Sequence, residues 1–382
     1  MRRFNNLVTL FTAISAFFFG SFIMKILCSV EKCPANKSEA FQLKSHPNLF
    51  LLVVVLSAPS NYDQRNVIRK TWLNSTTQPL QLPYYPEDLI YIPPYGPSGH
   101  LQLESVPQQA NRLRQYLKWQ KDLLSKEPTK SQRRIKVKHI FSIGTGKLGS
   151  YLQTKLLKEQ EQHGDLLLLQ EHQDTYSNLT VKLLETLASL RSNYTFSYVL
   201  KVDDDTYVKL DSLVNELVSY DRKLLRKSIE YDQNPLPQLY WGYFNGRATI
   251  KKRGHWKESN YYLSQNYLPY ALGGGYVLSQ QLCEYILNSS HLLTPYVSED
   301  VSIGTWVAPL RHVYRWHDPR FDTGYMPRKC QPYHIVLHKR NLKMMTDIYG
   351  DKLCSNTGSS SLPEYYYDWT KTSDKCCDSL VV

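Results

Sequence analysis

The sequence predicts an α/β fold in which a mostly parallel sheet is covered by helices on both faces. Its apolar runs, such as NLFLLVVVLSAP at residues 48–59, show no polar alternation, as expected of strands buried on both faces. Segments with helical spacing separate these runs, and this alternation is typical of parallel strands joined by crossover helices. Of the 382 residues, 42% are hydrophobic and 21% charged, which indicates a globular rather than a disordered chain.

Each element follows from a local pattern. In order, the pattern predicts a strand at 48–59, a helix through 64–72, a strand at 137–143, a helix at about 151–162, a strand at 165–170, a helix at 178–190, a strand at 197–202 and a helix at 205–219. Residues 78–107 are rich in Pro and Tyr and show little periodicity, so they are expected to form an inserted surface loop.

The N-terminal region predicts a membrane anchor. Residues 7–24 are uncharged, and at 1.5 Å per residue a helix over them would be roughly 27 Å long, close to the thickness of a bilayer core. A cleaved signal peptide is the alternative, but the apolar run continues past the Ala- and Ser-containing segment that resembles a cleavage site. We therefore expect a cytoplasmic tail at 1–6, a transmembrane signal-anchor at 7–24, a stem at 25–46 and a lumenal domain at 47–382.

Glycosylation acceptors and cysteines favour a lumenal location for that domain. The Asn-x-Ser/Thr acceptors are Asn36, Asn74, Asn178, Asn193 and Asn288, although Asn178 at a helix start is better explained as a structural or cap residue. Four of the seven cysteines gather near the C-terminus, at Cys330, Cys354, Cys376 and Cys377. Two disulfides are expected there, with three pairings open; zinc is the alternative, but no CxxC pair is present.

The formal net charge of +12 raises nucleic acid as a partner, and SQRRIKVK at 131–138 is a local basic run. A lumenal protein would not meet nucleic acid, so none is expected. The excess charge better suits an anionic small molecule or an acidic polymer, and the run itself is most simply a solvated surface.

Three consecutive carboxylates, Asp203, Asp204 and Asp205, follow the strand predicted at 197–202. Like charges this close repel, so the arrangement is costly unless a cation or hydrogen-bond donors offset it. Ligands bind at the carboxyl ends of strands in such sheets, which favours a metal site. The alternative is an acidic turn that caps the helix predicted from Asp205.

A second acidic pair, Glu299 and Asp300, lies about a hundred residues later, after a glycine run at 273–275 that would let backbone approach a ligand closely. Two acidic clusters suggest two tasks, metal binding and general base catalysis. Nucleotide-sugar transfer needs both, because a diphosphate must leave while an acceptor hydroxyl loses its proton. Adding the imidazole of His338 to carboxylates favours manganese, although a single His in a strand is more often structural.

GTGKLG at 144–149 offers a different class of enzyme. It satisfies GxGxxG, follows a predicted strand and has Glu171 after the next strand, as in an NAD-dependent oxidoreductase. That interpretation leaves both acidic clusters without a task, and a tight strand-to-helix turn explains the glycines.

Several motifs together resemble the β-1,3-glycosyltransferase family of inverting enzymes with the GT-A fold. The motifs are, in order, RNVIRKTW (65–72), DTYSNLTVK (174–182), YVLKVDDDTYV (198–208), LYWGYF (239–244), YLPYALGGGYVLS (267–279), SEDVSIG (298–304) and VLHKR (336–340). The likeness spans about residues 48–377. A narrower resemblance is to members that act on the proteoglycan linkage region, and it is carried by LYWGYFNGR, NYLPYALGGGYVLS, SEDVSIGTWVAP, HDPRFDTGY and the C-terminal YDW.

The resemblance implies a role for each matching residue. Asp205 and His338 would hold Mn²⁺, and Asp203 and Asp204 would reach the ribose and the metal shell. Asp300 would be the general base, supported by Glu299. Further residues would lie near the nucleotide and its phosphates: Arg65, Arg69, Asp174, Lys182 and Gly274. From the residues alone, Arg65 and Arg69 could instead make only surface ion pairs.

The implied reaction is transfer of galactose from UDP-galactose to the 3-hydroxyl of the galactose on a xylose-linked proteoglycan primer. The implied setting is the Golgi membrane, as a single-pass type II protein that could associate with other linkage-region transferases. A β-1,3-N-acetylglucosaminyltransferase of the same fold and a non-catalytic carbohydrate-binding protein are the alternatives. The aromatic residues Trp241, Trp256, Tyr261, Tyr262 and Tyr267 are either core or a sugar-stacking platform.

Overall fold

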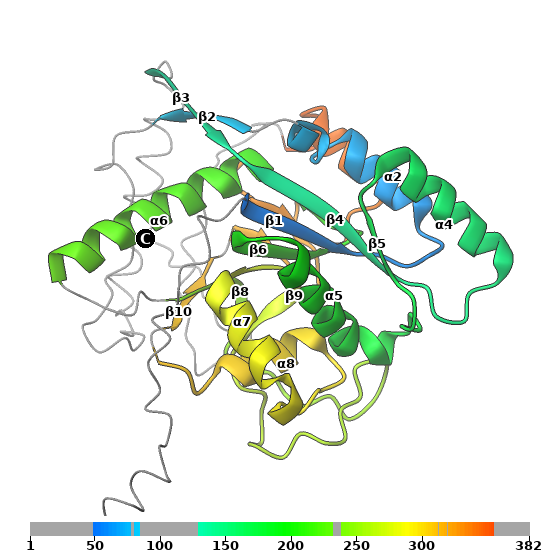
Figure 1. Cartoon of the computed structure of the whole chain (residues 1–382). Coiled ribbons are helices and arrows are strands. Elements are labelled where there is room, and N and C mark those ends of the chain that lie inside the picture. The colour runs from blue at the N-terminus through cyan, green and yellow to red at the C-terminus, as the bar shows by residue number, and fades with distance from the viewer. Residues whose placement is uncertain are drawn as a thin grey trace, which may run out of the picture. The chain divides into compact units, whose positions relative to one another are not determined.

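The computed structural model describes residues 49–77, 80–84, 129–231, 238–311, 313–318 and 320–354 (Figure 1). The predicted tail, anchor and stem, most of the 78–107 interval, and Cys376 and Cys377 lie outside these residues, so those predictions stay predictions. Among the described helices, none is both long enough and apolar enough to cross a membrane.

The central sheet has seven strands in the order β10-β8-β9-β6-β1-β4-β5. Their bounds are β1 Leu49–Leu56, β4 Val137–Gly144, β5 Leu166–Leu169, β6 Phe196–Asp203, β8 Gln238–Asn245, β9 Tyr270–Ser279 and β10 Val313–His317. β9 runs antiparallel to both of its neighbours, while every other pair in this sheet is parallel. The four strands predicted before residue 203 are confirmed, and so is the mostly parallel arrangement.

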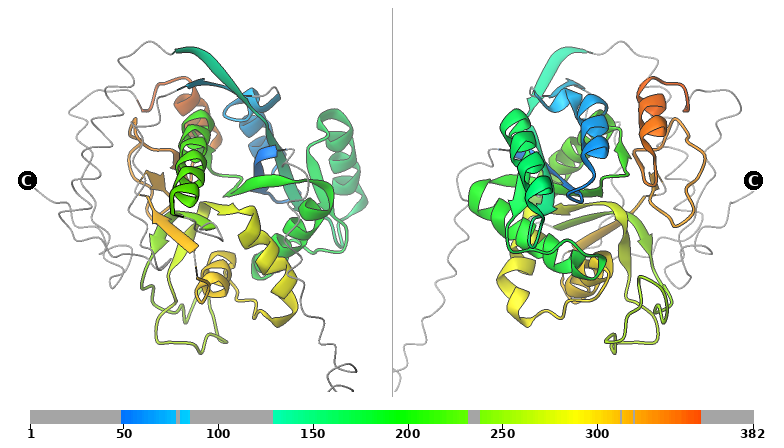
Figure 2. Two further views of the ribbon diagram at one scale, coloured as in Figure 1. Left: turned by 60° about the vertical axis from the view of Figure 1, so that its left-hand side comes forward. Right: turned by 90° about the vertical axis from the view of Figure 1, so that its right-hand side faces the viewer.

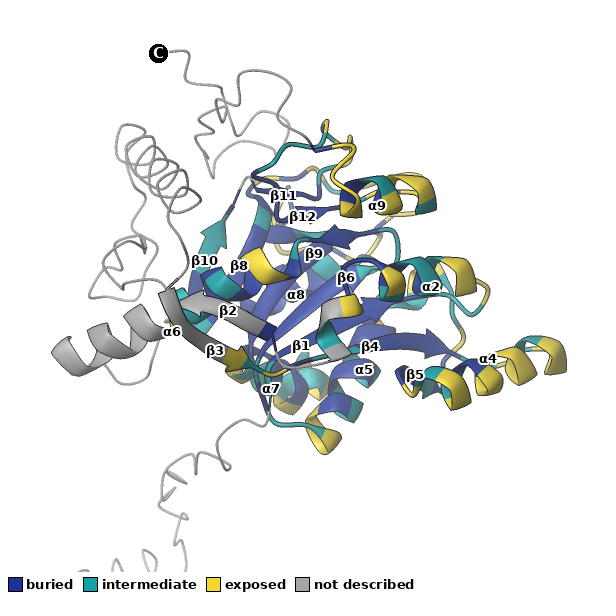
Figure 3. Cartoon of the chain, turned by 90° about the horizontal axis from the view of Figure 1, so that it is seen from above, coloured by how far each residue is buried: buried dark blue, intermediate teal, exposed yellow. Residues whose placement is uncertain are grey.

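Helices cover both faces of this sheet (Figures 1 and 2). Alternate side chains of β1 point into two separate hydrophobic clusters, as the period-two geometry of a strand requires. One cluster takes side chains from α2 (Tyr62–Lys70), α4 (Ser150–His163), α6 (Leu210–Tyr231) and α9 (Leu342–Tyr349). The other takes them from α5 (Leu179–Asn193), α7 (Gln280–Ser289) and α8 (Glu299–Val307). Figure 3 shows the result: the strands are buried, and exposed residues lie on the outer sides of α2, α4 and α9.

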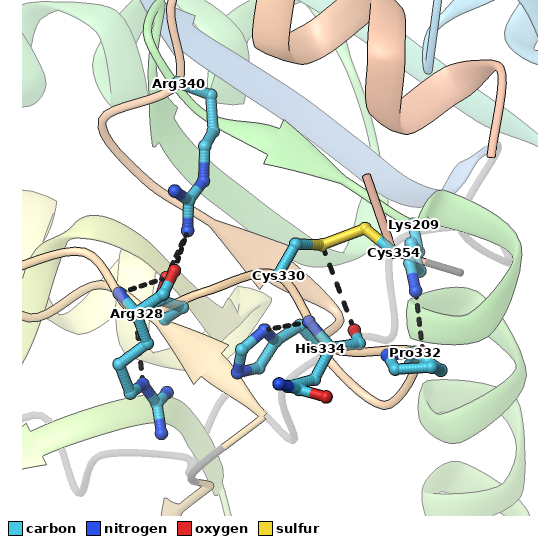
Figure 4. The surroundings of a disulfide bond; sticks show 9 residues. Lys209, Arg328, Cys330, Pro332, His334, Arg340 and Cys354 are labelled. Atoms are coloured by element: carbon cyan, nitrogen blue, oxygen red, sulfur yellow. Dashed lines mark hydrogen bonds and ion pairs between the residues drawn. A yellow bond between two sulfur atoms is a disulfide. The ribbon is translucent and has the colours of Figure 1, made fainter. Parts of the chain in front are cut away.

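A smaller sheet in the order β11-β12-β7 lies beyond the end of β6. It joins β7 (Tyr207–Val208), β11 (Phe321–Asp322) and β12 (Val336–Leu337), with Leu337 opposite Tyr207 in an antiparallel pair. A disulfide links Cys330, which precedes β12, to Cys354, which follows α9 (Figure 4). The smaller sheet therefore holds a late segment of the chain against the residues that follow β6.

Two expectations need correction. The helix after the aspartates begins at Leu210 rather than at 205, because β7 intervenes, so the aspartates do not cap it. Within the interval expected to be loop, Leu80–Tyr84 forms the strand β2, which pairs antiparallel with β3 (Thr129–Ile135). The basic run at 131–138 is divided between β3 and β4.

The short 3-10 helices are η1 (Asn74–Thr77), η3 (Tyr176–Asn178) and η4 (Ser290–Leu292). Asn178 stands at the N-cap position of α5, but its side chain makes no capping hydrogen bond; its Nδ2 donates instead to the carbonyl of Gln173 at 3.3 Å. Asn74, Asn193 and Asn288 are exposed, as glycan acceptors must be.

Candidate active site

The three aspartates form the turn between β6 and β7, at the carboxyl edge of the sheet. Asp203 is the last residue of β6 and lies opposite Leu56, the last residue of β1, in the parallel register. The turn is closed by Thr206, whose backbone N–H donates to the carbonyl of Asp203 at 3.1 Å. Its side-chain hydroxyl donates to the carbonyl of Gly274 at 2.8 Å. The aspartates thus occupy the edge at which α/β sheets bind ligands.

The smaller sheet brings His338 to this turn from more than a hundred residues away. Because β12 pairs with β7, the residue after β12 comes beside the residues before β7. The backbone N–H of Arg340 donates to the carbonyl of Asp205 at 2.8 Å. As a result, Nε2 of His338 lies 3.0 Å from Oδ1 of Asp205 and 3.5 Å from Oδ2 of Asp203.

Two carboxylates and one imidazole make a donor set that suits a divalent cation such as Mn²⁺. One ligand atom from each of Asp203, Asp205 and His338 lies within 4.8 Å of the others. Oδ1 of Asp205 is buried, and its close polar neighbour is Nε2 of His338 at 3.0 Å, so these two ligand atoms face each other. Burial acts to raise the pKa of Asp205, but His338 and Lys201 outweigh it and lower that pKa, so the carboxylate stays ionised. The resemblance implies that Asp203 reaches the ribose and the metal shell; the geometry groups it with the ligand pair Asp205 and His338.

Asp204 turns away from that group. Oδ2 of Asp204 accepts a hydrogen bond from Nδ2 of Asn61 at 2.9 Å, in the loop that follows β1. Burial and the neighbouring aspartates raise the pKa of Asp204, although Asn61 and Ser57 oppose the shift. Asp204 therefore belongs to the β1 side of the site.

Gly274 has a steric reason to be glycine. A Cβ on this residue would lie 2.4 Å from the ring of His338, which is closer than two carbon atoms that are not bonded to each other can come. The glycine run thus allows β9 to pass directly beside the imidazole. Its predicted approach to a ligand stays a prediction, because the approach seen here is to the protein's own side chain.

Lys201 connects the two acidic clusters. It lies in β6, two residues before Asp203, and its Nζ donates to Oδ1 of Asp203 at 2.8 Å and to the carbonyl of Gly273 at 2.6 Å. The same Nζ contacts Oε1 of Glu299. Burial acts to lower the pKa of Lys201, but Asp203 and Glu299 raise it above its usual range, so the ammonium stays charged.

Glu299 and Asp300 form the first turn of α8. Oδ2 of Asp300 accepts from the backbone N–H of Gly273 at 2.8 Å, and Oδ1 accepts from that of Val301 at 2.8 Å. Burial raises the pKa of Asp300 to about 6, against the opposing effects of Lys201 and these two N–H groups. Burial also raises the pKa of Glu299 to about 8, because one ammonium cannot neutralise three nearby carboxyl groups. Of the two carboxyl groups, Asp300 has the lower pKa.

Lys201 is the functional residue that the sequence analysis missed. Its signal was present: a lysine inside the apolar run YVLKV of a buried strand is costly unless it is paired. The partner on α8 lies nearly a hundred residues away, so periodicity could not identify it.

Two of the residues predicted to lie near the nucleotide, Arg65 and Lys182, form buried contacts with the backbone of the loop that follows β1. Nη1 of Arg65 donates to the carbonyl of Ala58 at 2.7 Å, and Nζ of Lys182 donates to the carbonyl of Ser57 at 2.8 Å. Lys182 also pairs with Asp174, with 2.6 Å between Nζ and Oδ2. These side chains hold the loop from which Asn61 reaches Asp204.

Arg65 and Arg69 are anchored by carboxylates of α4 and of the α4–β5 connection. Both pair with Glu159 at 2.7 Å, and Arg69 pairs with Asp165 at 2.7 Å. Arg65 is fully buried. The ion pairs therefore exist, but they lie in the interior and not on the surface, as the alternative had it. Direct contact of these arginines, or of Asp174 and Lys182, with a nucleotide stays a prediction.

The first two glycines of GTGKLG have a packing role that needs no dinucleotide. A Cβ on Gly144 or Gly146 would lie 2.8 Å from backbone atoms of the segment that follows β5. The backbone N–H of Gly144 donates to Oδ2 of Asp174 at 3.2 Å. The glycines therefore let the turn after β4 pack against that segment.

Comparison with known proteins decides between the enzyme classes. The galactosyltransferase family model matches residues 124–315. The chain belongs to the galactosyltransferase family. It is accordingly a hexosyltransferase, which takes a nucleotide-sugar donor and a glycan acceptor, and the GT-A-like α/β fold expected from the motif resemblance is consistent with the mostly parallel sheet.

Individual relatives agree with that membership. The chain is 42% identical over 242 residues to mouse beta-1,3-galactosyltransferase 6, a match that covers 62% of this chain and 70% of the mouse protein. It is 32% identical over 155 residues to human UDP-GalNAc:beta-1,3-N-acetylgalactosaminyltransferase 2, covering 41% of this chain and 28% of the human one. It is 29% identical over 203 residues to the hydroxyproline O-galactosyltransferase GALT5 of Arabidopsis thaliana, covering 52% and 28%.

The aromatic residues of this galactosyltransferase divide into two groups. Trp241, Tyr261 and Tyr267 are buried and belong to the core, and Nε1 of Trp241 donates to Asp318 at 3.0 Å. Trp256 and Tyr262 are exposed. The core alternative is therefore confirmed for the first three residues, and a sugar-stacking role for Trp256 and Tyr262 stays a prediction.

Proposed function

We propose that this galactosyltransferase transfers galactose from UDP-galactose to the 3-hydroxyl of galactose in a galactosyl-xylose primer on a proteoglycan core protein, with inversion. The motif resemblance and the identity to mouse beta-1,3-galactosyltransferase 6 support the sugar and the linkage. The observation that carries the mechanism is that the acidic pair of Glu299 and Asp300 is joined to the metal-type cluster by Lys201, which contacts both Glu299 and Asp203.

Asp300 acts as the general base. A pKa of about 6 leaves its carboxylate ionised at neutral pH and yet basic enough to accept the proton of a hydroxyl as that hydroxyl attacks. The N–H groups of Gly273 and Val301 fix its orientation. The acceptor oxygen forms its bond to the anomeric carbon while the bond from that carbon to the UDP oxygen breaks, so one displacement inverts the configuration.

Asp203, Asp205 and His338 would hold Mn²⁺. When bound there, the cation offsets the negative charge that the departing diphosphate gains. Lys201 holds Asp203 in place and supplies a fixed positive charge between the two clusters. Asn61, in the loop after β1, and Asp204, in the turn after β6, lie on the side where the ribose is expected.

The proposed setting is the Golgi lumen, with residues 7–24 as a type II signal-anchor. Support comes from the apolar run, from the exposed acceptor sites Asn74, Asn193 and Asn288, and from the disulfide between Cys330 and Cys354, which suits an oxidising compartment. Association with other transferases that build the same primer is part of this proposal.

A second candidate keeps the mechanism and changes the donor to a UDP-N-acetylhexosamine. The 32% identity to human UDP-GalNAc:beta-1,3-N-acetylgalactosaminyltransferase 2 is the observation that supports this second donor.

The test offers the full chain, purified in detergent with Mn²⁺, a galactosyl-xyloside acceptor and one of three donors: UDP-galactose, UDP-N-acetylglucosamine or UDP-N-acetylgalactosamine. We expect β-1,3-linked galactose in the product, detected by mass spectrometry and linkage analysis, and lost when a chelator is added. Transfer of an N-acetylhexosamine alone would overturn the substrate claim. Transfer that survives chelation would overturn the metal assignment.

A further inference from the structure

An exposed basic loop lies outside the machinery described so far. Its sequence, KKRGHWK, spans Lys251–Lys257, and every residue in it is exposed. Within the described part of the chain, Lys251, Lys252, Arg253 and Lys257 have no carboxylate partner. A basic run of this kind is often only a solvated surface. Whether it can bind a partner near the active site depends on how it is attached to the rest of the molecule.

The basic loop is tied to the helix that carries the proposed base. Glu258, at the end of the loop, is buried, and its Oε2 accepts from the backbone N–H of Val297 at 2.8 Å. Val297 lies just before α8. The backbone N–H of Glu258 donates to the carbonyl of Lys251 at 2.8 Å, which closes the loop. The cations are thus displayed from a fixed turn next to the residues that lead into Glu299 and Asp300.

Exposed aromatic rings connect the basic loop to the acidic clusters. The ring centroid of Trp256 lies 6.2 Å from that of Tyr176 and 6.0 Å from that of Tyr325, and these three residues come from separate segments. All three are exposed, at 38%, 41% and 69%, although large apolar groups are normally buried. Tyr176 leads into α5, whose Thr180 donates its hydroxyl to the carbonyl of Tyr296, just before α8, at 2.6 Å. Nζ of Lys339, the residue after His338, lies 4.1 Å from the centroid of the Tyr325 ring.

We propose that the basic loop binds an acidic peptide that carries the acceptor sugar. This inference rests on the proposed function. With the reacting sugar at Asp300, the next sugar would lie along the rings of Tyr176 and Trp256, and the carrier would meet the lysines and Arg253.

Two physical reasons favour a peptide over one isolated anion. An extended peptide presents a side chain about every 3.5 Å, so several carboxylates can face cations that are spread over a whole loop. Each exposed ion pair contributes little by itself, but several together raise the association rate and the affinity for a partner of opposite charge.

The experiment compares two acceptors that differ only in the carrier: the galactosyl-xylose disaccharide on a peptide flanked by Asp and Glu, and the same disaccharide on a peptide flanked by Asn and Gln. We expect the kcat/KM of the full chain to be about tenfold higher for the acidic carrier, the summed effect of a few exposed ion pairs. This ratio should fall toward one as the salt concentration rises.

Paired variants assign the effect to the loop. Lys252→Ala/Arg253→Ala should bring the ratio of the two kcat/KM values close to one. The matched control, Lys155→Ala/Lys158→Ala, removes two exposed charges from α4 and should keep the wild-type ratio. Lys252→Glu/Arg253→Glu should reverse the preference, so that a carrier flanked by Lys becomes the better substrate.

A wild-type ratio near one, or an equal loss in the α4 control, would overturn the inference. So would a loop variant that keeps the ratio but loses binding to vesicles of anionic lipid, because the loop would then contact a membrane. Absence of galactose transfer to both acceptors is a separate result, which would overturn the proposed function itself.

Discussion

The two acidic clusters of the site use the same chemical groups in opposite surroundings. In the turn after β6, the side chains of Asp203 and Asp205 are 35% and 45% exposed, whereas that of Glu299 on α8 is 5% exposed. Opposing influences leave the pKa of Asp205 below its ordinary value and raise that of Asp300 to about 6. Similar carboxylates thereby acquire different tasks, since the ionised ones in the turn suit a cation and the half-buried Asp300, beside the buried Glu299, suits proton transfer.

The sharpest test of this division is Asp300→Asn. The amide keeps the shape of the side chain but cannot accept the proton, so we expect kcat to fall by about a thousandfold while Mn²⁺-dependent UDP binding is retained. Initial rates and calorimetric titration with UDP measure the two effects separately. Full turnover in this variant would show that the buried cluster does not supply the base.

Asp205→Ala addresses the other cluster. Removing a ligand oxygen should weaken UDP binding in the presence of Mn²⁺ by about a hundredfold, and UDP binding without metal should change little. If this variant and Asp300→Asn lost Mn²⁺-dependent UDP binding to the same extent, the two clusters would not have separate tasks.

The pH dependence should report the buried cluster. Protonation of Asp300 removes the base, so kcat/KM is expected to fall about tenfold per unit as the pH drops below about 6. An unburied aspartate would place this limb near 4. The measurement is a pH–rate profile at saturating Mn²⁺; a limb near 4 would mean that the proton is taken by a more exposed carboxylate.

Gly274→Ala tests how the exposed cluster is assembled. The added methyl group collides with the ring of His338, so we expect a loss of about 2 kcal/mol in stability and weaker Mn²⁺ binding. Gly149→Ala is the control, because a Cβ there meets nothing within 4 Å. Thermal unfolding and metal titration of both variants distinguish the collision from a general effect of alanine.

The smallest expected effect is that of Asn61→Ala, which removes the hydrogen bond to Asp204. A loss of about 1 kcal/mol corresponds to a roughly fivefold increase in the KM for the donor, with kcat nearly unchanged. A change in kcat instead would indicate that the loop after β1 acts on the chemical step.

The sequence predicted features that depend on neighbouring residues in the chain, and it failed for features that depend on contacts between distant residues. The buried strands and both acidic clusters are contiguous in the chain, so their patterns were visible there. The burial of Arg65 was not, because its partner Glu159 lies in a helix 94 residues later. The contact between Lys201 and Glu299, and the collision that makes Gly274 necessary, likewise depend on how β9 and α8 pack against β6.

The reversed direction of β9 has an evolutionary consequence. β8 runs parallel to β6 and ends at Asn245, and β9 begins at Tyr270 and runs back, so residues 246–269 are displayed at the same edge of the sheet as Asp203. Changes of charge and length in its exposed part, residues 251–257, leave the strand pairings of the central sheet intact. Natural selection can therefore change which acceptors are recognised without disturbing the residues that hold the donor, and related enzymes are expected to diverge most in length and charge between β8 and β9.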